Sequence, residues 1–188
     1  MQSVLKEQYG MTITELEQCI DEYGKDIYSF CRQITGSTQE GEDLYQDTFL
    51  KAMELSERMD KEKNPKSFLL SIAIRLWKNR RRKLAGRQRI AGMESLDAKI
   101  EMNGLSVGTE EGLPEEEILT REQSDLVRSC IAELSEKYRI PIYLYYSAEL
   151  SVKEISGCLK LSEGTVKSRL HKARTMIKER LEAYGYDK

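Results

Sequence analysis

Basic and polar side chains recur along one face of a predicted helix near the C-terminus. This face carries Lys167, Ser168, His171, Lys172, Arg174 and Lys178. Lys and Arg neutralise phosphates, and Ser, Lys and Arg also donate hydrogen bonds to base edges. The opposite stripe is apolar at helical spacing, with Val166, Leu170, Ala173, Ile177 and Leu181. This pattern suits a helix in a DNA groove, although a solvated amphipathic helix shows the same pattern.

The residues immediately before this helix favour the DNA-binding alternative. Ser151 and Glu154 form a capping box that starts a short helix over 152–160, and Ser162 caps the following helix. Apolar residues of the short helix can pack against the apolar stripe of the longer one. Two helices joined by a tight turn are typical of a helix-turn-helix, whose second helix enters the major groove.

The string S-V-K-E-I-S-G-C-L-K-L-S-E-G-T-V-K-S-R-L-H-K-A-R, residues 151–174, resembles the C-terminal domain of bacterial sigma factors of the extracytoplasmic-function (ECF) type, in the sigma-70 family. In that family this domain binds the promoter −35 element. The resemblance implies −35 contacts from Thr165, Lys167, Ser168, Arg169, His171, Lys172 and Arg174.

The rotation of the predicted helix divides this set. If the apolar stripe faces the domain core, Lys167, Ser168 and His171 point into the groove near the helix start and are the base readers. Arg169 lies nearer the flank, and Lys172, Arg174 and Lys178 then hold the DNA backbone. Two residues depart from the family pattern. Lys160 stands where a turn glycine is usual, which implies modest strain if its φ is positive, and Gly157 lies within the short helix.

The segment E-D-L-Y-Q-D-T-F-L-K-A, residues 42–52, resembles the core-polymerase-binding helix of the same family. Asp43, Gln46, Asp47 and Leu50 share one helical face because they lie at i, i+3, i+4 and i+7. Acidic residues around an apolar one suit a docking face. The residues alone favour a solvated acidic face with one exposed leucine. The resemblance implies instead that these four residues bind RNA polymerase core.

A second basic cluster ends the third predicted helix, R-L-W-K-N-R-R-R-K at residues 75–83. Such a surface attracts phosphate backbones with a salt-dependent affinity. In the family, this helix and the preceding loop engage the −10 element and help to open it. The implied −10 contacts are Asn64, Arg75, Trp77, Lys78, Asn79, Arg80, Arg81, Arg82 and Lys83. Asn64 could pair with an extruded base, and Trp77 either stacks on an unpaired base or packs half-buried in the domain.

The elements that position these residues are predicted to be helices throughout. Helices are expected over 12–35, from Ser37 to about Arg58, and from Pro65 or Lys66 to about Leu84. The apolar stripes of the first and third helices are Ile13, Leu16, Ile20, Ile27, Phe30 and Ile34, and Phe68, Leu69, Ile72 and Leu76. Helical periodicity resumes near Arg121, and Pro141 either kinks a helix over 136–147 or delays its start.

The predicted fold is therefore all-α, with two small helical domains at 12–85 and 120–184. Residues 86–119 are acidic and rich in glycine, which predicts a flexible linker. The C-terminal domain is the helix-turn-helix.

Several classes of function are disfavoured by what the chain contains. Its four cysteines have no metal-binding spacing, and it has one histidine among 188 residues. The cysteines are expected to be small buried hydrophobes in a reducing cytoplasm. The sequence shows no phosphate loop or nucleophile–base pair, so neither an enzyme, a metal site nor a cofactor is expected. It also shows no signal peptide and no apolar run long enough to insert in a membrane.

Taken with the resemblance, these features predict a sigma factor that binds RNA polymerase core, directs it to specific promoters and assists promoter opening. The expected partners are the polymerase core, promoter DNA in double-stranded and melted form, and an anti-sigma factor. The alternative is a stand-alone helix-turn-helix transcriptional regulator with a helical sensor or dimerisation domain.

Overall fold

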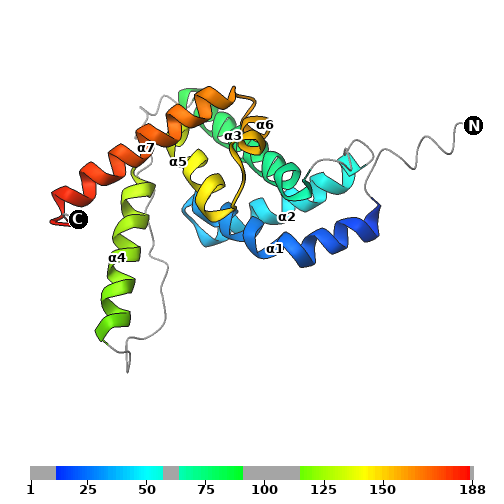
Figure 1. Ribbon diagram of the computed structural model, residues 1–188. Coiled ribbons are helices and arrows are strands. Elements are labelled where there is room, and N and C mark those ends of the chain that lie inside the picture. The colour runs from blue at the N-terminus through cyan, green and yellow to red at the C-terminus, as the bar shows by residue number, and fades with distance from the viewer. Residues whose placement is uncertain (1–11, 57–63, 91–114, 187–188) are drawn as a thin grey trace, which may run out of the picture.

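The computed structural model describes residues 12–56, 64–90 and 115–186, and within these ranges every regular element is a helix (Figure 1). This confirms the all-α prediction. The elements are α1 (Ile13–Thr35), α2 (Thr38–Leu55), α3 (Pro65–Ile90), α4 (Glu115–Ala132), α5 (Glu136–Ile142), a π-helix η2 (Tyr143–Ser147), α6 (Val152–Leu159) and α7 (Glu163–Ala183). None of the described helices is both long enough and apolar enough to cross a bilayer.

Helices α1 and α2 form a tight hairpin whose turn follows from its residue types. Gly36 adopts a left-handed conformation at φ 72°, and its N–H donates to the carbonyl of Arg32. Ser37 then caps α2 by accepting a hydrogen bond from the N–H of Glu40. Farther along, Gly41 allows the two helices to approach closely, because an added Cβ would lie 2.8 Å from Cγ and 2.9 Å from Cα of Arg32.

Helix α3 packs against α1 and α2 and contributes more of the core than its predicted stripe. Leu69 and Ile72 are buried as predicted, and Leu70, Ala73 and Ile74 are buried as well. Helix α6 of the C-terminal domain also packs on α3, and Ile74 lies at this junction together with Leu159 of α6. The prediction for Ile20 was wrong, since its side chain is 38% exposed. Three of the cysteines are buried as expected, and Cys158 is partly buried.

Two helices extend into the segment that was predicted to be a linker. Helix α3 continues to Ile90, past the expected end near Leu84, and it includes Gly86. Helix α4 begins at Glu115 rather than near Arg121. Glycine lowers helix stability by about 1 kcal/mol, which neighbouring good helix formers can offset. Residues 91–114 lie outside the described ranges, as does the predicted end of the second helix at Arg58.

The C-terminal domain places its proline inside a helix. Helix α5 begins at Glu136 and contains Pro141, so the predicted delay of its start does not occur. Proline cannot donate an intrahelical hydrogen bond, and the chain widens directly after it into the π-helix η2. Helices α6 and α7 follow as the predicted pair, and α4 and the C-terminal part of α7 extend away from the bundle (Figure 1).

The close approach at Gly41 can be tested with a single methyl group. Gly41→Ala should lower the free energy of unfolding by about 1–3 kcal/mol, because the new Cβ would force α2 away from the backbone of Arg32. Gly157→Ala is the matched control: nothing lies within 4 Å of its added Cβ, and alanine should stabilise α6 by up to about 1 kcal/mol. Urea unfolding followed by circular dichroism measures both. If the free energy of unfolding of Gly41→Ala equals that of the wild type, the close packing of α1 and α2 is contradicted.

Candidate nucleic-acid and polymerase interfaces

The helix-turn-helix is fixed by hydrogen bonds at both helix starts. Ser151 and Glu154 form the predicted capping box at α6, and the Ser162 side chain accepts from the N–H of Thr165 at the start of α7. Between the helices, Lys160 adopts the left-handed conformation at φ 54° and ψ 48°. Its positive φ confirms the expected strain, because a side chain crowds the backbone there.

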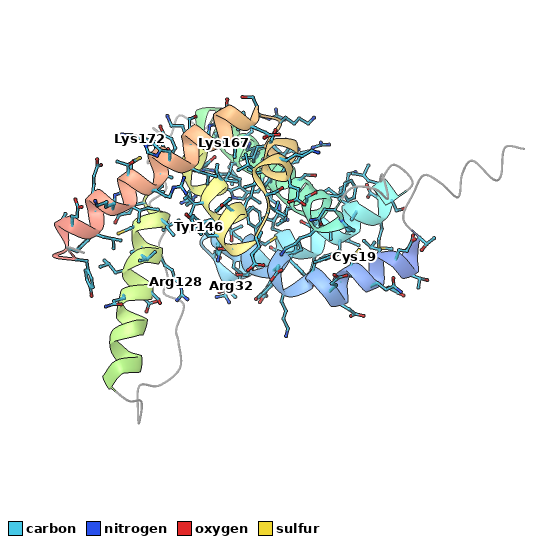
Figure 2. The ribbon with its side chains drawn as sticks, viewed as in Figure 1. Cys19, Arg32, Arg128, Tyr146, Lys167 and Lys172 are labelled. Carbon is cyan, nitrogen blue, oxygen red and sulfur yellow. The ribbon has the colours of Figure 1, made fainter. Side chains whose placement is uncertain are left out.

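The rotation of α7 is the one that its apolar stripe predicts. Val166, Leu170 and Ala173 are buried in the domain core, so the opposite face is presented to solvent. The predicted DNA-facing residues that are exposed are Lys167, Ser168, His171, Lys172 and Arg174, whereas Thr165 and Arg169 are partly buried. Figure 2 shows Lys167 and Lys172 along α7, with Tyr146 on the neighbouring η2. The hydroxyl of Tyr146 accepts a hydrogen bond from Arg174 at 3.4 Å.

The predicted core-binding residues lie together on the outer side of α2. Asp43, Gln46 and Leu50 are exposed, and the Leu50 side chain is 60% exposed. The sequence reasoning missed Met53, which lies three residues beyond Leu50 and is 49% exposed. Its spacing from Leu50 was the available signal. Two exposed apolar side chains beside acidic ones make this face a stronger docking candidate than a single leucine would.

Asp47, the fourth residue of that set, is ion-paired with Arg80 of α3. An Nη of Arg80 lies 2.5 Å from Oδ2 of Asp47 and also donates to the carbonyl of Asp43 at 3.2 Å. The side chain of Arg80 therefore points toward the α2 face. Sequence spacing could not show this, because the two partners lie 33 residues apart.

The remaining predicted −10 residues fall into two groups. Arg81 forms an ion pair with Glu136 of α5 and lies over the ring of Trp77, 5.4 Å from its centroid. The residues that present their charge to solvent are Arg75, Lys78, Arg82 and Lys83, and Asn79 beside them is partly buried. Trp77 is only 5% exposed, so the packing alternative holds in this structure.

Asn64 acts as a connector between the two domains. Its Oδ1 accepts from the N–H of Lys66 at the start of α3, at 2.9 Å. Its Nδ2 donates to Oε1 of Glu154 in α6, at 2.6 Å. The pKa of Glu154 is held below its usual value, first by the hydroxyl of Ser151 and also by Asn64. The sequence predicts that the loop over residues 60–66 holds an extruded base, and residues 60–63 of this loop lie outside the described ranges.

Cys158 completes the contact between the domains. Its thiol donates to the carbonyl of Ser67 at 3.1 Å, across 91 positions of sequence. Burial raises the pKa of this thiol to about 12. The contacts of Asn64 and Cys158 dock α6 on the start of α3, and the contact of Arg81 joins α3 to α5 of the same C-terminal domain. Within the described part of the chain, no group of His, Cys, Asp and Glu side chains could hold a metal ion.

Comparison with known proteins matches both halves of the chain. The model of Sigma-70 region 2 matches residues 19–87, and that of Sigma-70, region 4 matches residues 124–177. The chain is 32% identical to the ECF RNA polymerase sigma factor SigW of Bacillus subtilis over 168 residues, covering 86% of each chain. It is 29% identical to SigM of the same organism, covering 89% of this chain and 94% of SigM.

Solved structures show the same fold. The sigma factor RpoE from Bartonella quintana, in complex with the anti-sigma factor NepR, aligns with a TM-score of 0.72 at 19% identity, over 90% of this chain and 98% of that one. CnrH, in complex with the cytosolic domain of CnrY, aligns with a TM-score of 0.64 at 17% identity, over 92% and 90% of the two chains.

The thiol of Cys158 provides a test of the domain contact. The thiolate is the reactive form, so a thiol with a pKa of about 12 should alkylate slowly with iodoacetamide at pH 8. Arg81→Glu removes the ion pair with Glu136 and should increase the alkylation rate of Cys158 several-fold, because the domains separate more often. Lys83→Glu, an equal charge change at an exposed position nearby, is the control. Equal rates in both variants, read by mass spectrometry, would refute this role of Arg81.

Proposed function

This chain belongs to the ECF RNA polymerase sigma factors of the sigma-70 family, and we propose that it binds core polymerase through α2, the −10 element through α3 and the −35 element through α7. Such a protein directs polymerase to specific promoters and assists their opening. The observation that supports the assignment of α7 most directly is its orientation, with Val166, Leu170 and Ala173 buried and a basic face outside. Residues 91–114 then connect the two promoter-binding domains.

The polymerase-binding face is proposed to centre on Leu50, with Met53, Asp43 and Gln46 around it. Exposed apolar side chains at the centre and polar groups at the rim are the usual anatomy of a protein interface. Asp47 belongs to the same face, but its carboxylate is already paired with Arg80. We therefore assign the main apolar contact to Leu50 and Met53.

The −10 element is proposed to lie along the basic end of α3. Arg75, Lys78, Arg82 and Lys83 are ready to neutralise phosphates. Arg80 and Arg81 can join them only by leaving their carboxylate partners. Opening of the duplex is attributed to binding energy for exposed bases, since unstacking costs a few kcal/mol per step.

A protein with these interfaces acts by binding rather than by catalysis, and its place is beside the polymerase in the cytoplasm. The two solved complexes contain the partners NepR and CnrY, the first of which is an anti-sigma factor. We infer that an anti-sigma factor also binds this chain. The alternative of a stand-alone helix-turn-helix regulator would require tight promoter binding without polymerase, and measuring that affinity separates the two.

The polymerase face can be tested by one substitution. Leu50→Arg should weaken binding to core polymerase by about tenfold or more, because the complex loses an apolar side chain that the interface would bury and gains a charge in its place. Its helical circular dichroism should not change, since the side chain is exposed. Ile20→Arg, at an exposed apolar position on α1, is the control. If Leu50→Arg binds as tightly as this control, α2 is not the docking face.

The orientation of α7 predicts different effects for two of its cations. Lys167→Ala should cost about 1–3 kcal/mol at one base pair of the −35 element and relax specificity there. Arg174→Ala should weaken binding to all sequences alike. It should also reduce the slope of log affinity against log salt concentration by about one. The measurement is holoenzyme affinity for a −35 mutation series at several salt concentrations. The reverse outcome would show that α7 is rotated differently in the groove.

A further inference from the structure

A basic cavity lies where the two domains meet. Its volume is about 320 Å³, and it opens between α3 and the C-terminal end of α6. The cations that line it are Arg75, Lys78, Arg82 and Lys160. Ser71 and Asn79 add polar groups beside them. The cavity exists in the docked arrangement, because α3 supplies three of the cations and Lys160, directly after α6, supplies the fourth.

The charge of this cavity is not balanced by its own walls. No Asp or Glu is among the described residues that line it. Glu154, the acidic residue of α6, is occupied elsewhere: its carboxylate accepts from the N–H and hydroxyl of Ser151 and from Asn64. Four like charges converging in a partly enclosed space repel one another. An anion that brings several negative charges would relieve this repulsion and stabilise the docked arrangement.

Lys160 gives a second reason to expect a ligand. It holds the left-handed conformation at φ 54°, where glycine would be free of strain. The hydroxyl of Ser156 donates to the carbonyl of Leu161, and the N–H of Leu161 donates to the carbonyl of Ser156, so the turn itself is fixed. The lysine side chain takes no part in these hydrogen bonds, but it adds a positive charge to the cavity.

We propose that this cavity binds a small multivalent anion of the phosphate class, such as an inorganic polyphosphate or a nucleoside polyphosphate. Its volume lies at the lower end of that of small-molecule sites, and its cations match phosphate oxygens. Arg75, Lys78, Asn79 and Arg82 are also among the proposed −10 contacts. The anion therefore competes with the −10 element and favours the docked arrangement. The site itself rests on the docked geometry and not on the proposed promoter contacts.

Calorimetric titration of the full chain with sodium tripolyphosphate, without polymerase or DNA, tests the site. We expect one anion per chain, and Lys160→Gly should weaken its binding about tenfold, since a charged hydrogen bond is lost. This variant should melt at or above the wild-type temperature, because glycine relieves the strain. Bound tripolyphosphate should also slow the alkylation of Cys158.

ATP in the same assay identifies the kind of anion that the cavity prefers. If ATP binds more tightly than tripolyphosphate, the cavity is a nucleotide site. If the two bind equally, the cavity recognises phosphate charge, and both results support the proposal.

Two control variants separate the site from diffuse charge attraction. Glu149→Gly relieves a similar strain, at φ 57° before α6, without removing a positive charge. Lys25→Ala removes one exposed positive charge from α1, outside the cavity. Glu149→Gly should bind tripolyphosphate at least as well as the wild type. Lys25→Ala should bind it nearly as well as the wild type. The proposal fails if Lys25→Ala weakens binding as much as Lys160→Gly, or if tripolyphosphate does not bind. It also fails if Lys160→Gly weakens the binding of a single-stranded oligonucleotide but not that of tripolyphosphate, because the cavity is then a nucleic-acid site.

Discussion

Every proposed interface of this protein depends on the packing of one helix, α3, which is covered on two sides. Its residues Leu69 and Leu70 are fully buried, and Ile74 faces the junction with α6. Burying a side chain of this size stabilises the fold by about 1.5–3 kcal/mol. Separation of the two domains would expose Ile74 together with part of Leu159. The apolar contact therefore favours docking, while the converging cations of the same junction oppose it.

Ion pairs arrange the basic end of α3 without holding it rigidly. Arg80 is paired with Asp47 of α2, and Arg81 with Glu136 of α5. All four side chains are at least one-third exposed, and pairs of this exposure contribute about 0–1 kcal/mol. A partner that neutralises one of these carboxylates can release the opposing arginine at little cost. Polymerase binding at α2 and phosphate binding at α3 therefore affect each other.

Local sequence patterns predicted the parts of the structure that local interactions determine. The cap at Ser162 and the capping box at Ser151 were predicted because each joins residues a few positions apart. The partner of Arg80 could not be predicted, because it is brought close by tertiary packing. The contact of Ile74 with the junction depends on α6, which lies in another domain and which the local pattern of α3 cannot show. The candidate site was thus predicted as separate surfaces but not as one junction.

Backbone strain at both ends of α6 shows which interactions set the geometry of the helix-turn-helix. Glu149 and Lys160 have φ of 57° and 54°, in a region where residues other than glycine are strained by about 1–2 kcal/mol. The strain at Glu149 persists next to the buried side chain of Leu150, and the turn at Lys160 is fixed by the hydrogen bonds between Ser156 and Leu161. Packing and hydrogen bonding therefore override the backbone preference of the single residue on either side of this helix. Since the turn at Lys160 sets the angle between α6 and α7, the packing that docks α6 on α3 also sets the direction in which the basic face of α7 points.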